Sequence, residues 1–119
     1  MPAKIDTYRQ MADRATATIT AQIRDWSRFL VFAGQLYKYR FLDQVMIYAQ
    51  RPDATACAEF DLWNSRMNRR VRSGSRGIAL LCNRNGRLSL RYVFDISDTE
   101  RRERSRDPMP WKYREWDCP

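Results

Sequence analysis

The chain has 119 residues, of which 44% are hydrophobic, so it holds enough apolar material for the core of one domain. Its 22 basic residues outnumber 14 acidic ones, and the formal net charge of +8 indicates a polyanionic partner. The longest apolar run, 29–33, is far too short to cross a bilayer, and the first residues lack a signal peptide's apolar run. We therefore expect a cytoplasmic protein without a membrane partner.

The residue types available for chemistry are restricted. The sequence contains no histidine, which removes the commonest general base and metal ligand. The three cysteines, Cys57, Cys82 and Cys118, match no zinc or haem spacing, and we expect buried free thiols. These features predict a protein that is not an enzyme and binds no cofactor or metal.

The first half of the chain has helical periodicity. A first apolar stripe recurs at three- and four-residue spacing: Ile19, Ile23, Trp26, Leu30 and Ala33. A second keeps a four-residue step until the helix-breaking Pro52: Tyr37, Phe41, Val45 and Tyr48. We expect two helices that face each other through these stripes. A short third helix is predicted over 58–67, with Phe60, Trp63 and Met67 on one side.

After Gly77 the apolar pattern changes from helical to alternating. Leu88, Leu90, Tyr92 and Phe94 alternate with other residues, as in a strand with one side buried. Residues 77–82 form a second predicted strand, and the Asn-Gly pair at 85–86 between them suits a hairpin turn. The sequence therefore predicts an α+β fold, with N-terminal helices packed on a small antiparallel sheet that contains a β-hairpin over about 77–94.

The predicted domain covers residues 1–99. Beyond Thr99 the chain becomes a mixed-charge run followed by Pro108 and Pro110, which indicates a surface loop or tail truncated from a larger protein. Trp111 and Trp116 lie in this segment and either cap the core or belong to a further domain.

Positive charge is concentrated in one window. No acidic residue occurs between Leu62 and Phe94, whereas the rest of the chain holds 14 basic and 14 acidic residues. The window contains eight arginines: Arg66, Arg69, Arg70, Arg72, Arg76, Arg84, Arg87 and Arg91. Guanidinium groups bind phosphate oxygens in pairs and stack on bases. We therefore expect these arginines to bind a nucleic-acid backbone, unpaired and together on one exposed side.

The predicted elements give these arginines positions. If the alternating apolar residues of the second hairpin strand face the core, Arg87 and Arg91 project from its opposite side, with Arg84 in the turn. Residues 69–77 form a glycine-containing basic loop whose amides could also approach phosphates. Tyr39 and Trp63 are candidate rings for stacking on bases, with burial in the core as the alternative for both.

Three other interpretations remain open. The arginines could be an ordinary solvated surface, since the chain has only three lysines and favours arginine throughout. They could instead dock an acidic partner, such as another domain of a larger protein. Asp95 and Asp98 at the end of the hairpin could hold Mg²⁺ in a nuclease-like enzyme, although a lone Asp-x-x-Asp is common in turns.

Four stretches, residues 41–52, 63–64, 70–78 and 92–99, have a familiar order and spacing. Together they resemble the N-terminal domain of ArdC-type antirestriction proteins, as found in large proteins of conjugative elements. The family's glycines match Gly74 and Gly77, and its basic positions match Arg70 and Arg72. The resemblance implies a non-catalytic, largely sequence-independent module for binding single-stranded DNA. The zinc protease-like domain that commonly follows has no counterpart here, because the chain lacks a His-Glu-x-x-His motif.

Overall fold

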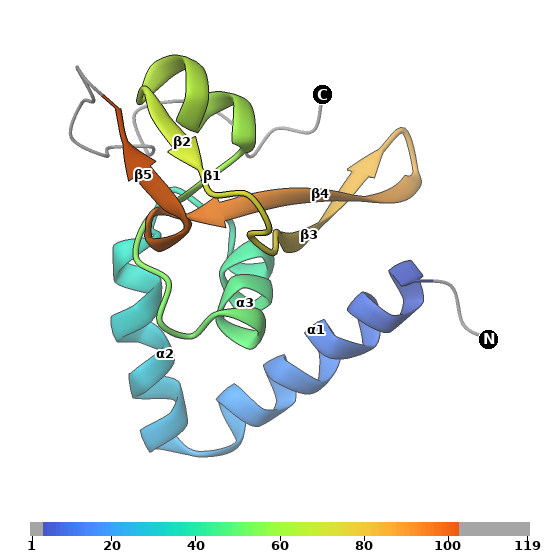
Figure 1. The fold of residues 1–119 in the computed structure, drawn as a ribbon. Coiled ribbons are helices and arrows are strands. Elements are labelled where there is room, and N and C mark those ends of the chain that lie inside the picture. The colour runs from blue at the N-terminus through green and yellow to red at the C-terminus, as the bar shows by residue number, and fades with distance from the viewer. Residues whose placement is uncertain (1–3, 103–119) are drawn as a thin grey trace.

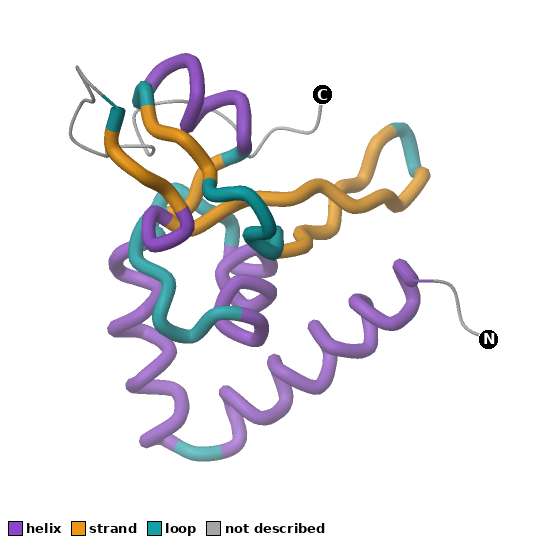
Figure 2. The backbone as a smooth tube through the Cα atoms, in the orientation of Figure 1, coloured by secondary structure: helices purple, strands orange, loops and turns teal. Residues whose placement is uncertain are grey.

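The structure is a computed structural model that describes residues 4–102 (Figure 1). Its helical half consists of α1 (Lys4–Ala21), α2 (Ile23–Gln35) and α3 (Phe41–Gln50). The strands are β1 (Cys57–Ala58), β2 (Arg69–Val71), β3 (Ile78–Arg84), β4 (Arg87–Asp95) and β5 (Thr99–Arg101). A π-helical turn, η1 (Leu62–Arg66), precedes β2, and a 3₁₀ turn, η2 (Ile96–Asp98), joins β4 to β5. The predicted α+β class is confirmed, with α1, α2 and α3 gathered on one side of the strands (Figure 2).

The strands form two small antiparallel sheets. One has the order β1-β4-β3, and the other is a ribbon of β2 and β5. In the β3–β4 hairpin, Ile78 lies opposite Val93 and Arg84 lies opposite Arg87. Asn85 and Gly86 between them both have positive φ, 54° and 79°, as an Asn-Gly hairpin turn requires. The hairpin predicted over 77–94 is therefore confirmed.

The helices bury a different stripe from the predicted one. α1 ends at Ala21 and α2 begins at Ile23, so the two helices do not share one continuous helical periodicity. The stripe predicted from Ile19 therefore does not continue past Gln22. Ile23 is 85% exposed and Leu30 is half exposed, so the prediction that they face the core is wrong. Phe29 and Phe32 are buried instead, because these larger rings turn inward and pack on Tyr48, with centroids 5.5 and 4.8 Å away.

The second predicted stripe is only half correct. α3 ends at Gln50, two residues before Pro52, as expected, and Val45 is fully buried. The helix begins at Phe41 rather than near Tyr37, and both of these rings are largely exposed.

Strand β4 lies between two apolar clusters. Val93 belongs to the larger cluster with the helices, and Phe94 packs against a smaller one formed by Ala58, Trp63 and Met67. Because both sides of this strand end are covered, strict alternation fails there. The prediction that Tyr92 faces the core is wrong: its side chain is partly exposed, and Val93 is buried in its place.

Short elements account for the remaining differences. The third predicted helix is reduced to η1 and its flanks, with Trp63 and Met67 buried and Phe60 half exposed. Residues 69–71 were expected in a loop but form β2, and they pair with β5. The expected domain end at Thr99 coincides with the first residue of β5.

Several sequence predictions concern the ends of the chain or its cysteines. Trp111 and Trp116 lie outside the described residues. Cys57 is buried and forms no disulfide, as expected, whereas Cys82 is disulfide-bonded, contrary to the prediction. Within residues 4–102, no helix combines the length and apolar character needed to cross a bilayer.

Candidate nucleic-acid interface

The β2–β5 ribbon presents two arginines on its outer side. Arg70 lies opposite Glu100 in the ribbon, with 3.7 Å between its Nη2 and the glutamate Oε2. Arg72 approaches the same carboxylate, its Nε 3.3 Å from Oε1, and donates from Nη1 to the carbonyl oxygen of Ser97 at 2.8 Å. Both side chains remain more than half exposed, at 61% and 53%. Two guanidinium groups thus share one carboxylate at the solvent boundary.

Arg69 points to the other side of the ribbon. Successive strand residues alternate sides, so Arg69 turns inward while its neighbour Arg70 turns outward. Arg69 is buried and donates from Nε to Oγ1 of Thr99 at 2.7 Å. Burial, together with the nearby charges of Arg101 and Arg72, lowers the pKa of its guanidinium. The expectation that Arg69 is available to a phosphate is wrong, and the residue instead fastens β2 to β5.

Arg91 is also withdrawn from solvent. Its side chain is 10% exposed, and its Nη1 donates to Oε1 of Glu59 at 2.8 Å. The sequence prediction that it projects from the hairpin is wrong, because the side of β4 that carries Arg91 also carries the buried Val93. An acidic residue from before the arginine window neutralises it.

The remaining hairpin arginines lie at its tip. Arg84 and Arg87 face each other beside the turn, exposed, and the described residues place no carboxylate within ion-pairing distance of either. Six residue steps of about 3.3 Å along β3 separate Arg84 from Ile78, or about 20 Å. Figure 1 shows the tip extending away from the β2–β5 ribbon. The expectation of a single face carrying all eight arginines is therefore wrong.

Arg76 and Arg66 lie nearer the ribbon. Arg76 is exposed in the loop between β2 and β3, with no ion pair to any described residue. Arg66 is exposed at the end of η1, the turn that packs against β2. Arg101 and Arg102 were not among the predicted site residues, because the segment that forms β5 was expected to be a tail. Arg101 is exposed, and Arg102 donates to Oδ1 of Asn64 at 3.0 Å.

Neither predicted stacking ring is available. Trp63 is fully buried, and its indole nitrogen donates to the carbonyl oxygen of Phe94 at 2.9 Å. Tyr39 packs against the larger core cluster, and its hydroxyl donates to the carbonyl oxygen of Cys57 at 2.7 Å. The alternative of burial in the core is therefore correct for Trp63, and Tyr39 is partly buried against the core.

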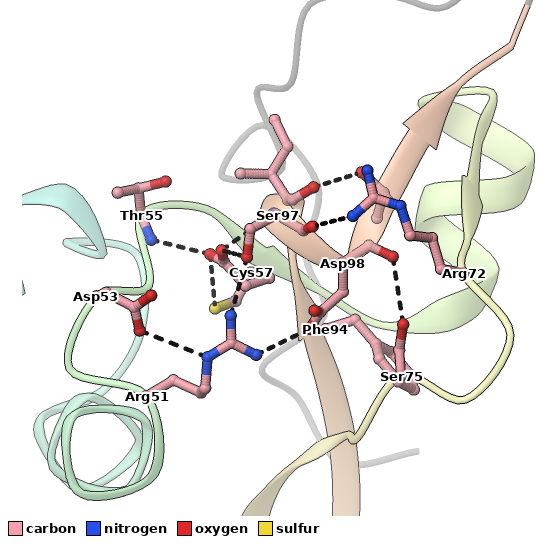
Figure 3. A network of polar contacts seen from close by, with 12 residues as sticks. Arg51, Asp53, Thr55, Cys57, Arg72, Ser75, Phe94, Ser97 and Asp98 are labelled. Carbon is pink, nitrogen blue, oxygen red and sulfur yellow. Dashed lines mark hydrogen bonds and ion pairs between the residues drawn. The ribbon is translucent and has the colours of Figure 1, made fainter.

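A polar network fixes the base of the ribbon (Figure 3). Arg51, at the end of α3, donates from Nη1 to Oδ2 of Asp98 at 2.9 Å and from Nη2 to Oγ of Ser97 at 2.9 Å. From the opposite side, the backbone amide of Arg72 donates to the carbonyl oxygen of Asp98 at 2.8 Å. Burial lowers the pKa of Arg51, but its contacts with Asp98 outweigh this effect and raise it overall. The turn between β4 and β5 is thus held from two directions.

Asp95 forms the buried part of this network. Its Oδ1 accepts from the backbone amides of Thr55 and Ala56 at 2.9 and 3.1 Å, and its Oδ2 accepts from the Ser97 hydroxyl at 2.6 Å. Burial alone would raise the pKa of this carboxyl, but the hydrogen bonds from Ser97, Thr55 and Ala56 lower it overall. The carboxylate is therefore held ionised by protein donors.

The described residues offer no metal centre. Asp95 and Asp98, the pair considered for Mg²⁺, are occupied by backbone amides and by Arg51 respectively. No group of three or more His, Cys, Asp or Glu side chains within residues 4–102 is placed to hold an ion.

Comparisons with protein-family profiles, with curated proteins and with solved structures give no match to this chain.

Proposed function

We propose that this chain is a non-catalytic module that binds single-stranded DNA through its phosphates, with little sequence preference, within a mobile-element protein of the ArdC type. The observation that carries the proposal is the positive charge that remains on the surface after folding. Arg70 and Arg72 share Glu100, and Arg76, Arg84 and Arg87 have no carboxylate partner among residues 4–102.

The ribbon arginines suit a phosphate backbone physically. A guanidinium can bind two phosphate oxygens at once, and about half of each side chain is open to solvent. Arg72 is already held on one side by the carbonyl oxygen of Ser97, which reduces the side-chain entropy lost on binding. Glu100 weakens the local field but cannot neutralise two arginines.

The arginines support contact with a polyanion, and the choice of a single strand rests on the resemblance described above. That resemblance includes residues 70–78, which hold Arg70, Arg72 and Arg76. Backbone contacts carry no sequence information, so binding should be largely independent of base order.

Competition binding tests the proposal. A labelled single strand is bound at about 0.1 M salt and competed with single-stranded DNA, duplex DNA and RNA of equal length. Single-stranded DNA should compete best. If about four phosphates are engaged, log affinity should fall against log salt with a slope near −3, at about 0.7 per phosphate.

Two results would reject the proposal. One is no binding to any oligonucleotide at tens of micromolar protein, and the other is a salt slope near zero. If the protein then bound an acidic polypeptide such as polyglutamate, the alternative of an acidic protein partner would be favoured.

A further inference from the structure

α2, the start of α3 and the segment between them expose aromatic rings that the core does not cover. Tyr37 is 58% exposed, Phe41 47% and Trp26 36%. Trp26 and Phe41 lie with ring centroids 6.5 Å apart, and the buried Phe29 supports both, at 5.9 and 5.7 Å. We call Trp26, Tyr37 and Phe41 the aromatic surface. Trp26 and Phe41 are held by their packing on Phe29, and all three rings remain partly open to solvent.

The chain segment that carries these rings is mainly basic. Between Gln22 and Leu42 the chain holds four basic residues, Arg24, Arg28, Lys38 and Arg40, and the single acidic residue Asp25. All four basic side chains are exposed. Lys38 places its Nζ 5.4 Å from the centroid of the Tyr37 ring, a cation–π contact. Open rings next to cations form the combination that binds single strands, in which bases stack on rings and phosphates meet the charges.

We propose that the aromatic surface stacks unpaired bases of the strand whose phosphates the arginines bind. This inference rests on the proposed function and supplies the stacking rings that Tyr39 and Trp63 cannot provide. The occupant is a single strand rather than a duplex, because the bases of a duplex already stack on one another and hide their faces. It is also not a second copy of this chain, because two such segments would bring eight basic side chains together with only two acidic ones.

An abasic oligonucleotide separates stacking from charge. It carries the same phosphates as a normal strand but offers no base to stack. The wild-type protein should bind the normal strand about tenfold or more tightly than the abasic one, with similar salt slopes for both. Replacing Trp26 and Tyr37 by leucine should remove most of this preference and leave abasic binding unchanged.

Phe60 supplies the matched control. It is an exposed ring outside the aromatic surface, so Phe60→Leu should leave the preference for the normal strand intact. A thermal melt of each variant confirms that it is folded before binding is measured.

The possible results discriminate clearly. Equal binding of normal and abasic strands by the wild-type protein overturns this inference and leaves the proposed function standing. Binding of neither strand rejects the proposed function itself. Sedimentation provides a further check: if the wild-type protein self-associates and Trp26→Leu abolishes this, the surface is occupied by a second copy and the inference is wrong.

Discussion

Arg91 and Glu59 form an ion pair that joins the middle of β4 to the residue that follows β1. The Arg91 Nη1 lies 2.8 Å from the Glu59 Oε1, and the arginine side chain is almost fully covered. Its other terminal nitrogen, Nη2, is buried without a hydrogen-bond partner among the described residues. Arg91, like the buried Arg69, therefore acts within the fold rather than on a ligand.

Arg91→Ala should destabilise the protein without weakening DNA binding. The change removes the ion pair of a covered arginine with Glu59, and because Glu59 is about one-third exposed the expected loss is about 2 kcal/mol, below that of a fully buried pair. Urea denaturation measures this loss. Arg84→Ala, at the exposed hairpin tip, is the control and should change stability by less than about 0.5 kcal/mol. Equal effects of the two changes would contradict the assigned role.

The hairpin could be predicted because its signals are local. The Asn85-Gly86 pair fixes the turn, and the turn fixes the register from Arg84 to Ile78. Which side of β4 faces the core could not be predicted in the same way. That choice depends on Trp63 and Met67, which cover Phe94 from a distant part of the chain.

The β2–β5 ribbon was missed for a related reason. β2 and β5 are three residues each, and they pair across 28 to 32 positions of sequence, so neither shows a periodicity of its own. The site prediction failed at Arg69 because assigning residues 69–71 to a loop removed the alternation that turns this side chain inward. Arg70, Arg72, Arg76, Arg84 and Arg87 were correctly expected to be exposed, because no apolar pattern includes them.

Asp95→Asn should lower stability and change its dependence on pH. The folded carboxyl has a pKa below its ordinary 3.8, so it stabilises the fold above that pH, and the contribution is lost as pH falls through the folded value. The amide would turn a donor toward groups that already donate, at a cost of about 2–3 kcal/mol near neutral pH. Denaturation of both proteins at several pH values checks this. The difference between them should shrink below pH 3.8, and a constant difference would contradict the mechanism.

Gln50→Leu should leave two backbone groups at the edge of β3 without their hydrogen-bond partner. The Gln50 side chain accepts from the Ala79 amide at 2.9 Å and donates to the Ala79 carbonyl oxygen at 2.8 Å, so one side chain satisfies both groups. Leucine has a similar size but leaves both unpaired, at a cost of about 1–3 kcal/mol. Hydrogen exchange measured by NMR should show faster exchange at the Ala79 amide. The Leu80 amide, at the neighbouring position of the strand, is the internal control.

Gly34→Ala should stabilise the protein, and Gly77→Ala should destabilise it. Gly34 lies in α2, and a Cβ there meets nothing within 4 Å, so the better helix propensity of alanine should contribute about 0.5–1 kcal/mol. At Gly77, directly before β3, the new Cβ would lie 3.1 Å from the Cβ of Tyr92, an atom attached to the main chain of β4. Thermal melts of the two variants should therefore shift in opposite directions.

Arg70→Gln combined with Arg72→Gln should weaken single-strand binding for every base sequence alike. Because each phosphate contact contributes about 0.7 to the salt slope, the loss of two contacts should reduce its magnitude by about 1.4. The matched control is Arg9→Gln with Arg14→Gln, which removes the same charge from the exposed side of α1. If affinity depended only on net charge, both pairs would have the same effect. The ribbon pair should reduce affinity more than the control pair and leave the preference for normal over abasic strands unchanged. This result would show that the ribbon binds phosphates and that other residues bind the bases.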